Sequence, residues 1–149
     1  MKAEDITMKT ATYFVTTILI ERTQEDGMTK LCTEQYAVDA ISFSEAEKKT
    51  YESMDSQVVS VKDISIAPYK EALLLNSEDA DKYYRVKVKE ITINEITGKE
   101  KKVPVCFLVR ASSTRVAEAV INEYYASTMI DMTVASIVET KILDIIYDI

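Results

Sequence analysis

Residues 13–20, YFVTTILI, recur 71 positions later as YRVKVKEI at residues 84–91. Extended without a gap, the same shift places residues 13–78 over residues 84–149 with 15 identities in 66 positions, among them the only two glycines of the chain. Unrelated sequences of this composition would share several times fewer identities. We therefore expect two copies of one unit, related by an internal pseudo-two-fold axis.

Each copy predicts the order ββαβ. Runs of β-branched and aromatic residues lead into a turn that ends at Gly27 or Gly98, and a second strand returns from each turn. Ser42 to Glu45 fits a capping box at the start of a helix, and Ser44 to Glu47 offers an overlapping alternative. Pro68 interrupts the extended segment that follows this helix. The expected elements are strands 12–21 and 29–41, a helix over about 43–54 and an extended segment over 58–75, then a strand from 84, a strand over 103–110, a helix over 113–126 and an extended segment over 132–147.

This order predicts an α+β fold with two helices packed on a mainly antiparallel six-stranded sheet. A chain of 149 residues can bury roughly 70% of its unfolded surface, so it needs no disulfide or metal to fold. We expect a single domain over 1–149, built from repeats at about 12–78 and 83–149, with the acidic stretch 76–82 as connection.

The composition favours a cytoplasmic protein. The formal charge is −7, and the chain has no signal-peptide core and no apolar run of the roughly 20 residues that a membrane span needs. Cys32 and Cys106 form no Cys-x-x-Cys motif, which favours two buried, reduced thiols, with a disulfide between them as the alternative.

The absence of histidine argues against an enzyme. It removes the Ser-His-Asp and Cys-His systems and most catalytic zinc sites. Glycine-rich phosphate loops are also missing, so we expect no cofactor. No metal is expected either, because the acidic run Glu78 to Asp81 lacks the glycine and distal glutamate of a calcium loop and is better explained as a solvated connector.

Basic residues gather in the second copy. Residues 84–89 alternate apolar and basic side chains, as a strand with one dry and one wet face does, and three lysines follow the next turn. If all six share a face, they form a positive patch suited to phosphates; the alternative is a solvated face on which lysines prevent edge aggregation. The candidate anion- or nucleic-acid-binding residues are Arg85, Lys87, Lys89, Lys99, Lys101 and Lys102.

The gapless alignment places three uncharged residues of the first copy, Phe14, Thr16 and Ile18, at the positions of Arg85, Lys87 and Lys89. The first hairpin would then be dry on both faces, as an interface or a buried central element is. Phe14, Thr16 and Ile18 are therefore candidate interface residues, and homodimerisation through this hairpin is one hypothesis.

Two further features suggest partners. The nine tyrosines, with doublets at 83–84 and 124–125, could stack on bases, although core packing is the competing role for the second doublet. Residues 144–149 mix acidic and apolar side chains like the partner-recruiting tail of single-stranded DNA-binding proteins, although the repeat places them in a strand.

A resemblance to known proteins lies in residues 11–15, 41–47, 126–131 and 139–142, and it covers nearly the whole chain. In these stretches the chain resembles an uncharacterised family of about 150 residues from Bacteroidetes and their phages and mobile elements. It implies origin rather than activity, so no catalytic residue can be transferred.

The first hypothesis for the function is a non-catalytic, phage-related binding protein that acts through a protein partner or as a homodimer. A nucleic-acid binder, of single-stranded DNA in particular, or a nucleotide binder that uses the lysine-rich hairpin comes second. A small-molecule pocket between the two helices is third, and an enzyme is last.

Overall fold

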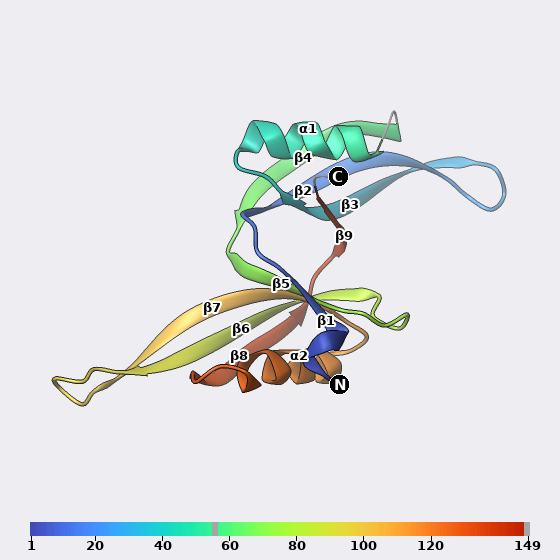
Figure 1. Ribbon diagram of the computed structural model, residues 1–149. Coiled ribbons are helices and arrows are strands. Elements are labelled where there is room, and N and C mark those ends of the chain that lie inside the picture. The colour runs from blue at the N-terminus through green and yellow to red at the C-terminus, as the bar shows by residue number, and fades with distance from the viewer. Residues whose placement is uncertain (55–56, 148–149) are drawn as a thin grey trace. The chain divides into compact units, whose positions relative to one another are not determined.

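The computed structural model describes residues 1–54 and 57–147, which form an α+β structure with two helices and two mixed sheets (Figure 1). The chain divides into two compact units. Unit 1 comprises Met1–Thr10 and Pro68–Thr140, and unit 2 comprises Ala11–Ala67 and Lys141–Ile149. Among the helices that the structure describes, none combines the length and apolarity needed to span a bilayer.

Unit 2 is a four-stranded sheet with one helix on it, in the strand order β4-β2-β3-β9. Its strands are antiparallel except for β9, which runs parallel to β3. Phe14, Ile18 and Ile20 of β2 pack in the core beneath the helix. The elements of unit 2 are β2 (Tyr13–Thr23), β3 (Thr29–Asp39), α1 (Phe43–Met54), β4 (Val58–Ala67) and β9 (Ile142–Ile146).

Unit 1 is a five-stranded sheet in the order β1-β5-β7-β6-β8, with β5 and β7 parallel and the other pairs antiparallel. Tyr84, Val86 and Val88 of β6 pack in the core beneath α2. The elements of unit 1 are the 3-10 helix η1 (Ala3–Asp5), β1 (Ile6–Lys9), β5 (Tyr69–Leu75), β6 (Lys82–Ile93), β7 (Glu100–Ala111), α2 (Thr114–Ala126) and β8 (Asp131–Glu139).

The expected single six-stranded antiparallel sheet is wrong. Each of the long extended segments, 58–75 and 132–147, divides into two strands that belong to different sheets. β4 stays in unit 2, and after Pro68 the chain continues as β5 in unit 1; likewise β8 stays in unit 1 and β9 joins unit 2. Each sheet therefore takes one parallel strand from the other half of the chain. After η1 and β1, both halves have the element order ββαββ.

Side chains cap both helices. The Ser42 hydroxyl accepts the N–H of Glu45 at 3.1 Å, and Glu45 Oε2 accepts the N–H of Ile41 at 3.4 Å. The capping predicted at Ser42 is thus confirmed, although Glu45 reaches Ile41 instead of Ser42 itself. Ser113 caps α2 in the same way, with its hydroxyl accepting the N–H of Val116 at 3.2 Å.

The two hairpins differ by one residue in their turns. The turn between β2 and β3 spans residues 24–28, whereas the turn between β6 and β7 spans 94–99. Val38 consequently pairs with Phe14, while Val109, 71 positions later, pairs with Tyr84, only 70 positions after Phe14. Because a one-residue slip moves every side chain of a strand to the other face, the gapless alignment compares opposite faces of β2 and β6.

Candidate functional site

Three basic residues share one face of unit 1. Arg85, Lys87 and Lys89 occupy alternate positions of β6, and the residues between them pack beneath α2, so the three basic side chains lie on the opposite face of the sheet. Lys102 of β7 joins them because residues directly opposite in a ladder share a face. On β7, Leu108 lies opposite Arg85, Cys106 opposite Lys87 and Pro104 opposite Lys89. Lys102 lies opposite Ile91 of β6. We call these four the basic face.

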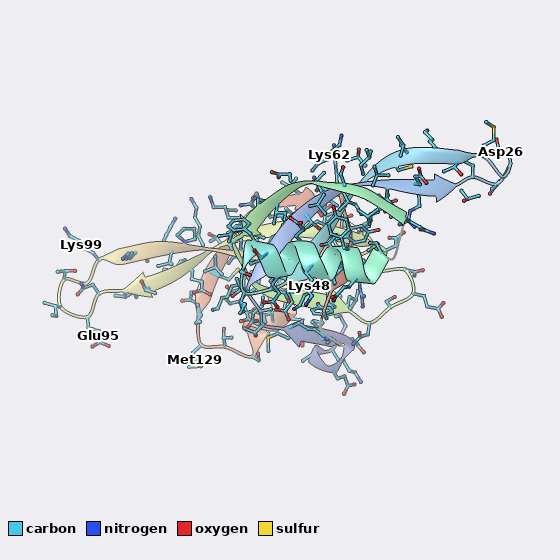
Figure 2. All side chains as sticks on the ribbon, turned by 90° about the horizontal axis from the view of Figure 1, so that it is seen from above. Asp26, Lys48, Lys62, Glu95, Lys99 and Met129 are labelled. Carbon is cyan, nitrogen blue, oxygen red and sulfur yellow. The ribbon has the colours of Figure 1, made fainter. Side chains whose placement is uncertain are left out.

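The other two candidates do not belong to this face. Lys101 pairs with Thr92 and therefore projects from the α2 side of the hairpin. Lys99 lies in the turn, where Figure 2 shows it with Glu95 at the end of the hairpin. Adjacent residues of a strand point to opposite faces, so Lys101 and Lys102 cannot act on one flat ligand surface together.

The four side chains of the basic face are open to solvent. All four residues are exposed, and within residues 1–54 and 57–147 no ion pair includes any of them. Arg85 Nη2 lies 4.0 Å from Cys106 Sγ. Burial raises the pKa of nearby Tyr69, and the positive charge of Arg85 opposes that increase. The charges of this face are thus available to an external anion.

Most of the basic residues belong to unit 1. Unit 1 holds 12 of the 18 basic and 13 of the 25 acidic residues of the chain, a formal charge of −1, and unit 2 carries the remaining −6. In unit 2, the positions equivalent to Arg85, Lys87 and Lys89 by sheet register are occupied by the neutral residues Val15, Thr17 and Leu19.

The proposed interface residues lie in a core. Phe14, Thr16 and Ile18 are 3%, 0% and 0% exposed, and they face α1. The Phe14 ring meets that of Phe43 edge to face at 5.1 Å between centroids. Since α1 covers them, a partner cannot reach these side chains. By register they correspond to Tyr84, Val86 and Val88, which are equally buried, so the apparent contrast between the hairpins came from the alignment.

The tyrosines near the basic face offer no stacking platform. Tyr69 and Tyr83 lie on that side of the sheet but are buried. The doublet at 124–125 packs on the other side, against Phe107, with ring centroids 5.2 and 6.0 Å away. Tyr125 Oη donates to Glu90 Oε2 at 2.6 Å, and burial followed by the neighbouring Glu71 raises the pKa of Tyr124 to about 12. Core packing is therefore confirmed for Tyr125.

A second polar cluster lies in unit 2. Arg22 donates two hydrogen bonds to Glu34, from Nη2 to Oε1 at 2.7 Å and from Nε to Oε2 at 3.1 Å, and Tyr36 Oη donates to the same Oε1 at 2.7 Å. These hydrogen bonds, that from Arg22 above all, lower the pKa of Glu34, while burial and the Glu34 carboxylate raise the pKa of Tyr36 to about 12. The carboxylate is satisfied by its own neighbours, which indicates a structural role.

Glu34→Gln is expected to lower the free energy of unfolding at pH 7 by about 1–2 kcal/mol, because two charge-assisted hydrogen bonds weaken and Arg22 is partly solvated. The folded-state pKa of Glu34 lies below its ordinary value, so its stabilisation exists above that value and is lost as the pH falls through the folded-state pKa. Urea unfolding should therefore show the difference shrinking below about pH 4. The matched variant Glu21→Gln, at an exposed position of β2, should show neither effect; a loss that is constant down to pH 2 would contradict this role.

The remaining candidate sites, a pocket, possible metal ligands and the two cysteines, give weaker evidence of function. A pocket of about 170 Å³ in unit 1 is below the range of roughly 300 Å³ and more typical of ligand sites. Its lining residues all belong to unit 1, so it is not the expected pocket between the helices. Within the described ranges no group of three or more potential ligand residues could hold a metal ion, and both cysteines are free and half-buried. The pocket is lined by Ala3, Ile6, Met8, Leu73, Glu123, Tyr124 and Ser127.

The C-terminal segment does not form a free tail over the residues that can be described. Residues 144–146 belong to β9 and pair with β3. Residues 148 and 149, which complete the proposed tail, lie outside the described residues.

Comparison with known proteins identifies a family. A family model described as "Domain of unknown function (DUF4494)" matches residues 12–148. No curated protein and no solved structure matches the chain.

Proposed function

The chain belongs to the DUF4494 family of domains of unknown function, and from this premise we propose that it is a non-catalytic binding protein whose unit 1 binds nucleic acid through phosphate contacts on the basic face. Phosphate contacts supply most of the affinity of sequence-independent nucleic-acid binding. A protein partner or a second copy remains the alternative ligand class.

The observation that carries this proposal is the row of cations along β6. Arg85, Lys87 and Lys89 are spaced by about 6.8 Å, the rise of two residues in an antiparallel strand, and Lys102 extends the row onto β7. A single small anion would need several donors converging on one point, whereas a row along a strand suits a ligand with charges repeated along its length. Buried tyrosines argue against base stacking, so the contacts would be made to the backbone.

We further propose that the protein acts in the cytoplasm, and in that of a Bacteroidetes host if a phage encodes it. We also propose that the chain is one domain that arose by duplication of a ββαββ unit, because the same element order occurs twice along the chain. Only one of the two copies carries the basic face, so the ligand would bind once per chain.

The test is fluorescence anisotropy with labelled single- and double-stranded oligonucleotides at two salt concentrations. Four phosphate contacts predict a loss of about a hundredfold in duplex affinity between roughly 50 and 200 mM salt. The triple variant Arg85→Glu, Lys87→Glu, Lys89→Glu should abolish binding at micromolar concentrations.

The chain offers a matched control. Lys30→Glu, Lys48→Glu and Lys62→Glu change the net charge equally, but these residues are exposed in unit 2, where Figure 2 shows Lys48 on α1 and Lys62 on β4. The control should keep most of the affinity. An equal loss in both variants, or affinity that does not change with salt, would contradict the proposal.

A further inference from the structure

The β6–β7 hairpin extends beyond the sheet of unit 1 (Figure 1). β8 pairs with β6 only as far as Ile91, and β5 pairs with β7 only from Cys106. Residues 92–105 therefore form a ribbon of two strands and their turn, beside which the described part of the chain places no further strand. Pro104 has no N–H to offer a further strand on β7, which helps to end the pairing with β5 at this point.

An ordered turn holds the end of this ribbon. Asn94 Oδ1 accepts the N–H groups of Ile96 and Thr97 at 2.9 and 3.1 Å, and the Asn94 carbonyl accepts the N–H of Gly98 at 2.8 Å. Gly98 has φ +71°, a conformation that other residues rarely adopt. This turn presents Ile96 with 95% of its surface exposed.

The ribbon combines this apolar end with lysines on both faces. Lys102 lies on the basic face, Lys101 on the opposite face and Lys99 in the turn, so lysines lie on both faces of the ribbon and at its end. The same segment contains two acidic residues, Glu95 and Glu100. Its formal net charge is therefore positive. An isolated exposed isoleucine needs no explanation, but one at the end of a cationic two-stranded ribbon does.

We infer that the ribbon enters the major groove of double-stranded DNA, with Ile96 against the base edges and Lys99, Lys101 and Lys102 toward the phosphates on either side. The inference rests on the proposed function and names its ligand. A two-stranded ribbon fits the B-form major groove, about 12 Å wide, but not the minor groove of about 6 Å. The deep, narrow major groove of duplex RNA excludes it as well. At the base edges the thymine methyl group is the apolar contact available to Ile96.

Ile96→Ser tests this role. Binding is measured by anisotropy on one sequence supplied as duplex DNA, single-stranded DNA and duplex RNA, and on duplex DNA with uracil in place of thymine. The wild-type protein should prefer duplex DNA, and Ile96→Ser should weaken duplex binding about tenfold, the effect of losing partial burial of one isoleucine. Uracil substitution should weaken wild-type binding but not further weaken that of the variant.

The first hairpin supplies the matched control. Met28 lies in the turn region between β2 and β3 and is 68% exposed, so Met28→Ser removes a comparable apolar side chain from the end of a hairpin that lacks the lysine cluster. It should leave every affinity unchanged. Equal binding to duplex and single strands, or full duplex affinity in Ile96→Ser, would overturn the groove inference while leaving phosphate binding intact. Failure of all nucleic acids to bind would overturn the proposed function itself.

Discussion

Lysine at position 16 is expected to destabilise the protein by about 3–5 kcal/mol, the cost of an unpaired charge in a core. Thr16 is fully buried beneath α1, and its Oγ1 lies 3.3 Å from Oγ1 of Thr50, which also donates to the Ala46 carbonyl at 2.8 Å. The gapless alignment equates Thr16 with Lys87 and so predicts that Thr16→Lys is harmless. The sheet register equates it instead with Val86, a core residue.

The matched substitution is Thr17→Lys, one residue further along β2. By register Thr17 is the counterpart of Lys87, it is half-buried on the face away from α1, and its neighbour on β4 is Asp63. The cost should be within about 1 kcal/mol, since a partly exposed charge beside a carboxylate gains and loses little. Urea unfolding of both variants compares the two alignments directly. If Thr17→Lys proves the more destabilising, the register derived from the structure is wrong.

The sequence contained part of the signal for this register. Identities at Tyr13 and Tyr84 favoured the shift of 71, yet the alternation of Arg85, Lys87 and Lys89 with apolar residues marks 84–88 as having one core face. In the first copy Phe14, Ile18 and Ile20 at even positions form the matching core face, but Tyr13, Val15 and Leu19 make the odd positions apolar as well. Matching core face to core face would have required the one-residue gap that the longer second turn provides. Burial is a stronger constraint on a strand than residue identity.

The basic face was predictable in part, because side chains alternate between the two faces of a strand. Alternation along one strand places Arg85, Lys87 and Lys89 together from sequence alone. The same alternation places Lys101 and Lys102 on opposite faces, so the six candidates could not share one face. The position of Lys102 beside Ile91 depends on the length of the turn, which the residues between Asn94 and Lys99 do not fix without the cross-strand pairs.

The parallel strands had no local signal. β5 and β9 are short apolar runs at the ends of longer extended segments, and Pro68 was the sole mark of a division between strands. The partner of each lies in the other half of the chain: β5 pairs with β7 and β9 with β3. Such pairing depends on contacts distant in sequence, which periodicity within a segment does not report.

This exchange of strands predicts the behaviour of a chain cut between its halves. A protease site inserted after the exposed Glu78, in the connection between β5 and β6, divides the chain without cutting a strand. After cleavage the two fragments should elute together as one folded species at micromolar concentration and separate only in denaturant. Each unit needs strands from both fragments, so separation would expose Leu73 of β5 and Ile146 of β9, both buried in the cores.

Leu73→Asp in the cleavable chain provides the contrast. Leu73 is fully buried among Phe107, Val109 and the residues of α2, so a carboxylate there should eject β5 from the sheet of unit 1. The uncut variant keeps its halves joined by the chain, whereas the cut variant loses much of what holds them together and should separate on gel filtration. Two independent tandem domains would behave otherwise, since cutting the linker would release two folded halves without any substitution. Wild-type fragments that part in this way would show that β5 and β9 return to their own halves, and that the sheets do not depend on exchanged strands.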